Sequence, residues 1–237
     1  MKTLQSTGII ALWLLNAAAC SPDKPAAIAA SPEPVAVETA AATAPAPDVS
    51  NLPAGAYKLD PLHASLIFRV SHLGFSNYTG QFRTFTADMT LDPAHPEKAS
   101  LTATVDLKSL DIPASPADFI AELLSDKFLG ASITPQMKYE SVSITKTGPA
   151  TADILGNLTL KGVTKPVTLH ATFNGGYEGH PMDPNARIGF SARGVLKRSD
   201  FGIDYGIPAP GSTMGVSDDV TIEIETEFSG PALEKKE

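Results

Sequence analysis

The sequence predicts an all-β fold with one short helix and, within that class, an eight-stranded antiparallel β-barrel. Three observations lead to this prediction. Eight stretches after residue 56 show, with differing regularity, the alternation of apolar and polar side chains that a half-buried strand requires. Turn-forming residues separate many of these stretches, so neighbouring strands are expected to be antiparallel. One interval, residues 116–129, instead carries apolar residues at helical spacing.

The clearest strand covers residues 220–228, where one face is apolar and the other is mostly acidic. The same alternation marks five further stretches, at residues 85–91, 101–107, 154–160, 167–173 and 188–194. Two less regular stretches, about 62–72 and 137–145, complete the set of eight. Strands of similar length with short connections favour a closed barrel over a sandwich. Eight strands enclose an interior that side chains fill or that holds one slender ligand.

The single helix is predicted between the third and fourth strands. Its apolar residues at helical spacing are Phe119, Leu123, Leu124 and Phe128. Ser115 is placed to cap the helix, with Pro116 at the first helical position. We expect this helix to lie across an end or a side of the sheet.

The first 20 residues resemble a lipoprotein signal peptide. The apolar run at residues 8–15 is about half the length that spans a bilayer, and small residues follow it up to Cys20, the only cysteine. A bacterial lipoprotein signal places a cysteine there, because its thiol receives the diacylglyceryl group. We therefore expect lipidation of Cys20 in an exported, periplasmic protein. Ser21 favours anchoring to the outer membrane. The alternative is ordinary cleavage after Ala19.

Residues 21–55 are predicted to form a disordered tether, since 18 of these 35 positions are Ala or Pro. The folded domain is predicted over residues 56–230, followed by a flexible tail at residues 231–237. The net charge is −8 and no basic face is visible, which argues against nucleic acid as a partner. Polyanionic membrane surfaces are poor electrostatic partners for the same reason, so membrane contact is expected from the anchor.

Several linked motifs occur in order along the predicted domain. They are residues 60–74 (beginning Asp-Pro-Leu-His), 80–85, 156–169, 189–192, 198–202 and 216–220. Together they resemble the YceI-like, polyisoprenoid-binding family of periplasmic proteins over about residues 56–229. The resemblance implies a lipocalin-like barrel whose long pocket holds an isoprenoid or another amphiphilic lipid, with no metal or redox cofactor. The chain departs from the family's pattern at Glu122, where the family commonly has His, so a different head-group preference is expected.

The candidate ligand-binding residues are apolar and aromatic side chains of the strands and the helix, together with one histidine. They are Leu66, Phe68, Val70, His72, Phe82, Phe85, Phe119, Leu123, Phe128, Tyr139, Phe173 and Phe190. Each aromatic side chain either lines a tunnel or fills a core, and the sequence leaves both readings open. His72 is included because it continues the inward face of its strand, with a hydrogen-bonded histidine at the barrel rim as the alternative role.

The remaining polar candidates have fewer distinguishing features. His63 and His72 are nine residues apart, and a regular strand points them to opposite faces, so no shared metal site is expected. Arg69, Arg83 and Arg198 are left with two roles, which are hydrogen bonding to carbonyl groups at the rim or contact with a polar head group.

The sequence contains no common catalytic motif. G-x-S-x-G, H-E-x-x-H, the P-loop and G-x-G-x-x-G are all absent. We therefore hypothesise a non-enzymatic carrier, buffer or scavenger of a polyprenyl lipid or quinone. One rival is a lipoprotein with a filled barrel that binds a partner. The other is a hydrolase or isomerase acting on an isoprenoid lipid, with Asp60, His72 or Glu122 as acid or base. A homodimer is left open.

Overall fold

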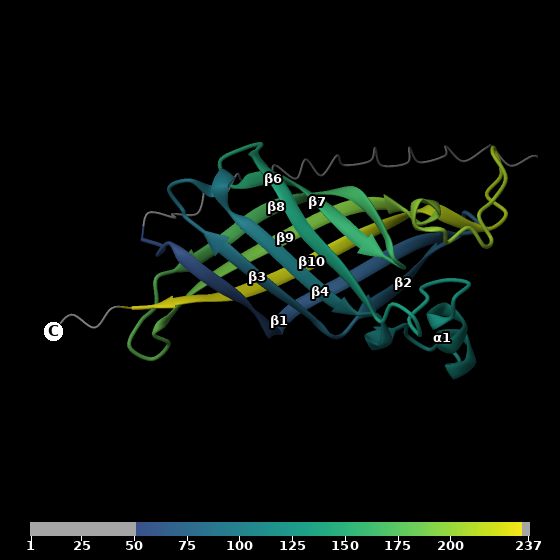
Figure 1. The fold of residues 1–237 in the computed structure, drawn as a ribbon, viewed down its shortest axis with the longest axis horizontal. Coiled ribbons are helices and arrows are strands. Elements are labelled where there is room, and N and C mark those ends of the chain that lie inside the picture. The colour runs from purple at the N-terminus through teal and green to yellow at the C-terminus, as the bar shows by residue number, and fades with distance from the viewer. Residues whose placement is uncertain (1–50, 234–237) are drawn as a thin grey trace, which may run out of the picture. The chain divides into compact units, whose positions relative to one another are not determined.

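The first described strand pairs with the last one described, and this pairing closes the sheet into a barrel (Figure 1). The computed structural model describes residues 51–233. The predicted signal peptide with Cys20, most of the predicted tether and the last four residues lie outside the described residues. Within the described part of the chain, no helix is long and apolar enough to cross a membrane.

Eight antiparallel strands form the ring, as predicted. Strand β1 (Gly55–His72) pairs with β10 (Val216–Ala232), and the other ring strands follow one another in chain order between them. Those strands are β3 (Phe85–Leu91), β4 (Ser100–Asp106), β6 (Gln136–Lys146), β7 (Thr151–Leu160), β8 (Val163–Tyr177) and β9 (Asn185–Lys197). Each of the eight stretches identified by its alternation corresponds to one of these strands.

Two shorter strands extend the ring at one end. Strand β2 (Ser76–Phe82) pairs with the second half of β1, and β5 (Leu110–Asp111) pairs with β2. The alternation did not reveal β2 because one of its inward positions is Gly80. A Cβ at this position would overlap the ring of Phe68 on the neighbouring strand. The missing side chain therefore makes room for a large one.

The helix α1 (Ala117–Leu124) lies at one end of the barrel, between β4 and β6 in the chain, as expected (Figure 1). The predicted cap is wrong. The hydroxyl of Ser115 donates to the carbonyl of Ile112 at 3.0 Å, so it completes the preceding turn, and Pro116 occupies the N-cap position. Three short 3-10 turns complete the described elements, namely η1 (Pro96–Lys98), η2 (Leu107–Ser109) and η3 (Arg198–Phe201).

The folded domain extends slightly beyond its predicted boundaries. Leu52 is buried beside Tyr57, and β10 continues two residues past the predicted end of the domain. Residues 52–55 and 231–232, which composition assigned to the tether and the tail, therefore belong to the fold. Composition missed them because a single buried leucine, Leu52, holds the first segment and pairing of β10 with β9 holds the second.

The buried residues form two clusters. One surrounds the middle of the barrel and the end beside α1. The other, which we call the closed-end cluster, fills the opposite end and consists of Leu52, Tyr57, Ala87, Leu91, Ala186, Ile188 and Phe228. Tyr57 is 0% exposed, and its ring lies where a Cβ at position 230 would stand, a space that Gly230 leaves free. This packing plugs the barrel at the end away from α1.

Candidate ligand-binding cavity

The barrel encloses a cavity of about 600 Å³ between α1 and the closed-end cluster. Residues of all eight ring strands line it, because alternate side chains of each strand point inward. On β10 the lining residues extend from Val216 to Phe228, roughly 40 Å of strand at 3.3 Å per residue. The cavity is therefore elongated, and its volume falls in the range of about 300 to 1,000 Å³ that is usual for small-molecule sites.

Eleven of the twelve candidate ligand-binding residues lie on the wall of this cavity. They are Leu66, Phe68, Val70, His72, Phe82, Phe85, Phe119, Leu123, Phe128, Tyr139 and Phe190. The structure does not place Phe173 there. Its ring packs beside Phe190 at a centroid distance of 5.4 Å and against the closed-end cluster, just before a break in the register of β8. Contact with a ligand stays a prediction for the eleven.

The floor of the cavity is aromatic. Phe228, a member of the closed-end cluster, and Phe190, which packs on that cluster, both line the cavity, with their rings edge to face at 6.2 Å. An apolar chain that enters from the α1 end therefore meets aromatic rings at the bottom, without a charged group to anchor its far end.

The cavity opens beside α1. We call four exposed lining residues at this opening the mouth: His72, Tyr78, Glu122 and Tyr205. The ring of Tyr78 meets Phe119 of α1 edge to face at 5.9 Å, and Tyr205 meets Phe128 at 5.6 Å. The helix and the segment that follows it therefore cover part of the opening.

Sequence reasoning missed both tyrosines of the mouth as site residues. Tyr78 lies on the strand that the alternation did not reveal, and Tyr205 lies in the long loop between η3 and β10. The available signal was the composition of that loop, which contains no Asp, Glu, Lys or Arg from Tyr205 to Ser217.

Glu122 stands at the mouth and does not project freely into it. Its carboxylate accepts a hydrogen bond from Lys127 Nζ at 3.0 Å, and the same ammonium group lies 3.2 Å from the centre of the Tyr205 ring. The hydrogen bond to Glu122 raises the pKa of Lys127. A ligand head group at this position would therefore meet a carboxylate and a lysine that already neutralise each other.

For Arg198 the structure favours the first of the two roles that the sequence left open, hydrogen bonding to backbone carbonyls. Arg198 is 7% exposed, and burial lowers its pKa. Its guanidinium group donates to four backbone carbonyls at 2.8 to 3.0 Å, those of Ile203, Tyr205, Val216 and Ser217. It thereby holds the two ends of the loop that carries Tyr205. Arg69 and Arg83 instead pair with Glu223 and Asp111.

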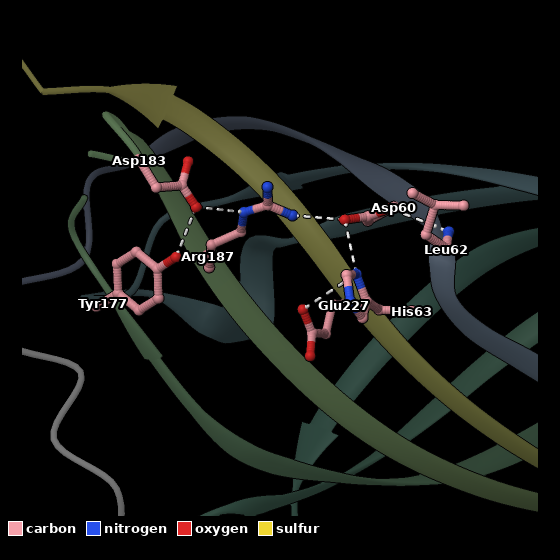
Figure 2. A network of polar contacts seen from close by, with 7 residues as sticks. All are labelled: Asp60, Leu62, His63, Tyr177, Asp183, Arg187 and Glu227. Atoms are coloured by element: carbon pink, nitrogen blue, oxygen red, sulfur yellow. Dashed lines mark hydrogen bonds and ion pairs between the residues drawn. The ribbon is translucent and has the colours of Figure 1, made fainter. Parts of the chain in front are cut away.

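A second group of polar side chains surrounds Arg187, whose neighbours in the chain, Ala186 and Ile188, belong to the closed-end cluster (Figure 2). Residues 60–63 form a bulge in β1, because these four residues stand opposite Glu227 alone on β10. Pro61 lacks the N–H that a regular ladder would need, which favours such a break. The bulge, together with a second register shift before His72, separates His63 from His72. His63 is on the outside and His72 is at the mouth.

Asp60 is the centre of this outer network, which Figure 2 shows. It accepts from Arg187 Nη1 at 2.6 Å and lies 3.0 Å from His63 Nδ1, while Arg187 also reaches Asp183 at 3.1 Å. Hydrogen bonds with His63, the Leu62 N–H and Arg187 lower the pKa of Asp60 to about 2. The bulge is therefore tied to β9 through charged hydrogen bonds.

Two chemical readings of this network can be tested by geometry. Asp60, His63 and Glu227 bring possible metal-ligating atoms within 4.8 Å of one another, but Arg187 already engages Asp60 Oδ2, the oxygen that His63 also contacts. The group is an ion-pair network. Asp60 is also absent from the cavity wall, so the three groups considered for acid–base catalysis do not converge, although His72 and Glu122 share the mouth.

A closed antiparallel barrel with an apolar interior that opens at one end is the architecture of a ligand-holding barrel. Residues 57–228 match the model of the YceI-like domain. A UPF0312 protein of Pseudomonas putida strain W619 is 39% identical over 173 residues, which cover 72% of this chain and 86% of the relative. The chain belongs to the YceI-like family.

The solved structures that are similar to this chain include two that bear on its fold and family. The YCEI protein of Campylobacter jejuni is 30% identical, with a TM-score of 0.58, over 68% of this chain and 90% of that one. A polyisoprenoid binding domain from Saccharophagus degradans is 15% identical, with a TM-score of 0.52, over 75% of this chain and 99% of that one. The second likeness shows the fold alone.

Proposed function

We propose that this protein binds a long apolar molecule, a polyisoprenoid or an isoprenoid quinone, inside the barrel and sequesters or carries it. The observation that supports this most strongly is the elongated cavity of about 600 Å³, with aromatic side chains at its floor and tyrosines at its mouth. A cavity of this size favours the proposed function over a barrel filled by its own side chains. The structural neighbour from Saccharophagus degradans is itself described as a polyisoprenoid binding domain.

The energetics fit a site of this kind. Each five-carbon isoprene unit that leaves water gains roughly 3 to 4 kcal/mol, at about 0.8 kcal/mol per carbon. Three or four units would offset the translational freedom and chain flexibility lost on binding. Affinity then comes from the tail, and no constellation of charged groups around the head is needed. The pairing of Glu122 with Lys127 at the mouth suits an uncharged head such as a quinone ring or an alcohol.

The proposed setting is the periplasm, with the barrel tethered to the outer membrane through lipidated Cys20. The support is the sequence pattern that ends at this residue, an apolar run followed by small residues. Metabolic labelling with a radioactive fatty acid tests the anchor. The wild-type chain should incorporate the label and Cys20→Ala should not, whereas equal absence of label from both chains would indicate ordinary cleavage.

Native mass spectrometry is the direct test of the cavity's content. The full chain is purified without detergent, weighed intact, extracted with organic solvent, and then incubated with ubiquinone and with a polyprenol. We expect one adduct of several hundred daltons for each protein molecule, either on isolation or after incubation. An unadducted mass under every condition would overturn the proposal.

A variant with a filled cavity provides the control. Ala103 on β4 and Ala192 on β9 line the cavity from opposite sides of the ring. The double variant Ala103→Phe/Ala192→Phe should fold and lose the adduct, because two rings then occupy the space of the ligand. Leu62→Ser, on the outer bulge, should keep it. Equal binding by both variants would place the ligand outside the barrel.

A further inference from the structure

The mouth of the cavity is bordered by exposed apolar side chains. Phe75, in the turn between β1 and β2, is 81% exposed, and Met214, in the loop before β10, is 70% exposed. Tyr205, which itself belongs to the mouth, is 59% exposed. Tyr205 therefore belongs both to the cavity wall and to the exposed outer rim.

These three residues lie on segments that are bonded together. The Leu73 N–H donates to the carbonyl of Gly215 at 2.8 Å, so the β1–β2 turn runs beside the loop that carries Met214. The Val216 N–H donates to the carbonyl of Gly206 at 2.8 Å, which joins the two ends of that loop. Arg198 holds the same ends from within. We call residues 70–82 and 205–217 together the tip.

The tip carries no Asp, Glu, Lys or Arg in its 26 residues. The whole chain is 19% charged, so a segment of this length would be expected to carry about five such side chains. Charged residues appear immediately outside it, at Arg69, Arg83, Asp204 and Asp218. A surface that stays in water gains nothing from lacking charged side chains. A surface that is buried against a partner does gain from it, because burying a charge without a partner is costly.

The chemistry of the tip identifies what covers it. An uncharged, Tyr-containing apolar rim suits the interface of a bilayer, where aromatic rings with one polar edge are favoured. A chain with a net charge of −8 gains nothing from an anionic surface, so neutral or zwitterionic lipid is the matching partner. The tip also borders the opening through which an apolar cargo must pass.

We infer that the tip docks on the neutral interface of a lipid bilayer, with Phe75 and Met214 inserted, and that cargo moves directly between membrane and cavity. This inference rests on the proposed function for the identity of the cargo. Docking itself is a separate property of the surface, so the two can be tested independently. The two halves of the test use one tip variant, Phe75→Ser/Met214→Ser, and one matched control, Leu62→Ser/Met182→Ser. The control residues are 87% and 92% exposed and lie away from the tip, toward the closed end.

Docking is measured without cargo, as the rise in surface pressure when the full chain is injected beneath a phosphatidylcholine monolayer. Any N-terminal anchor is common to wild type, tip variant and control. The tip variant should lose most of the rise that the control retains, and thermal unfolding should show that both are folded. Equal pressure rises for the two variants would overturn the inference, and the tip would then fit a protein partner.

Transfer is measured as uptake of ubiquinone from phosphatidylcholine vesicles. Direct contact makes the rate proportional to vesicle concentration, whereas release through water makes it independent of that concentration. We expect proportionality for wild type and control, and a rate lowered about tenfold in the tip variant, since losing part of the burial of two such side chains changes an equilibrium by that order. A wild-type rate independent of vesicle concentration would overturn the inference, as would a rate that rises on anionic vesicles and falls with salt.

The two proposals fail differently. If loading from detergent micelles fails for wild type, the proposed function is wrong, and the monolayer result still decides docking. If micelle loading succeeds equally for wild type and tip variant while vesicle uptake differs, both proposals hold.

Discussion

The two ends of this barrel share one ring of strands but are packed differently. At the closed end, Tyr57 and Ile188 are almost completely buried, and Gly230 leaves the space that the tyrosine ring occupies. At the α1 end, Phe68 and Phe85 are only partly buried and face a cavity. An eight-stranded ring permits either outcome. The contrast shows that the size and packing of the inward side chains determine whether an end of the barrel is filled or holds a cavity. The number of strands does not determine it.

The additions to the ring reinforce this difference. At the closed end, the segment before β1 inserts Leu52 into the cluster around Tyr57. At the other end, β2 and β5 lengthen the wall, and α1 covers part of the opening. The first addition supplies packing, and the second extends the surface that a ligand can touch.

The largest expected effect comes from the tyrosine in the plug. Tyr57→Ala should lower the free energy of unfolding by about 3 to 5 kcal/mol, because it removes a fully buried ring and leaves a cavity. Tyr78→Ala, at the mouth, should cost about 1 kcal/mol or less, since solvent reaches that side chain. Urea denaturation of both variants measures the difference. Similar losses would mean that the two ends are packed alike.

A pair of alanines sharpens the same comparison. Ala186 lies in the closed-end cluster at 0% exposure, and Ala192 lines the cavity. Ala186→Phe should destabilise the protein by about 1 to 3 kcal/mol or more through overpacking. Ala192→Phe should change stability little, because its ring enters empty space. Thermal unfolding of the two variants checks this, and a larger loss for Ala192→Phe would contradict the presence of the cavity.

The clamp at the mouth should give a smaller effect. Lysine at position 198 cannot supply the four hydrogen bonds in the geometry of a guanidinium group. Arg198→Lys should therefore cost about 1 to 2 kcal/mol, from carbonyls left without a donor. Amide hydrogen exchange should accelerate at residues 203–206 and 215–217 and stay unchanged in the closed-end cluster. Unchanged exchange in the loop would show that Arg198 does not hold it.

The smallest expected effect is electrostatic and lies on the outer bulge. The pKa of Asp60 is about 2 in the folded protein and ordinarily 3.8. The unfolded chain therefore binds more protons between these values, so this contribution to stability is complete above about pH 4 and is lost as the pH falls toward 2. Asp60→Asn should flatten the pH dependence of the melting temperature in that window.

A second carboxylate provides the comparison for that titration. Hydrogen bonds with Gln81 and Arg83 also lower the pKa of Asp111, at the other end of the barrel. Asp111→Asn should change the same acid limb in the same direction and by less.

The contribution of His63 to stability depends on pH in the opposite direction. Its pKa is raised, first by Asp60, so its contribution is present below pH 6.5 and is lost as the pH rises through the raised value. An acid limb unchanged in Asp60→Asn would show that the bulge network does not contribute.

Much of the fold could be predicted because its signal is local. Alternation located all eight ring strands, and the inward face of β1 was predicted correctly from Leu66 to His72. The predictions failed where a tertiary contact overrode a local sequence preference. Gly80 interrupts the apolar pattern of β2 to accommodate Phe68, and Ser115 bonds to the preceding turn in place of capping α1.

The candidate site was predictable to the same extent and for the same reason. Inward-facing aromatics could be named from the period of the strands. Phe173 packs on the closed-end cluster and not on the cavity wall, and the period of a strand does not give a residue's depth in the barrel. Tyr78 and Tyr205 could not be found from periodicity. One lies on an unrecognised strand, and the other reaches the mouth only because Arg198 fastens its loop.

The sequence by itself determined the number of strands in the ring, the side chains that face inward, and the apolar character of the interior. These follow from a period-two pattern that each strand carries alone. Only the tertiary structure decided that one end is plugged, that the other encloses about 600 Å³, and that a charge-free tip borders the opening. The volume left empty depends on the combined size of side chains from opposite sides of the barrel. The sequence of one strand does not reveal how they fit together.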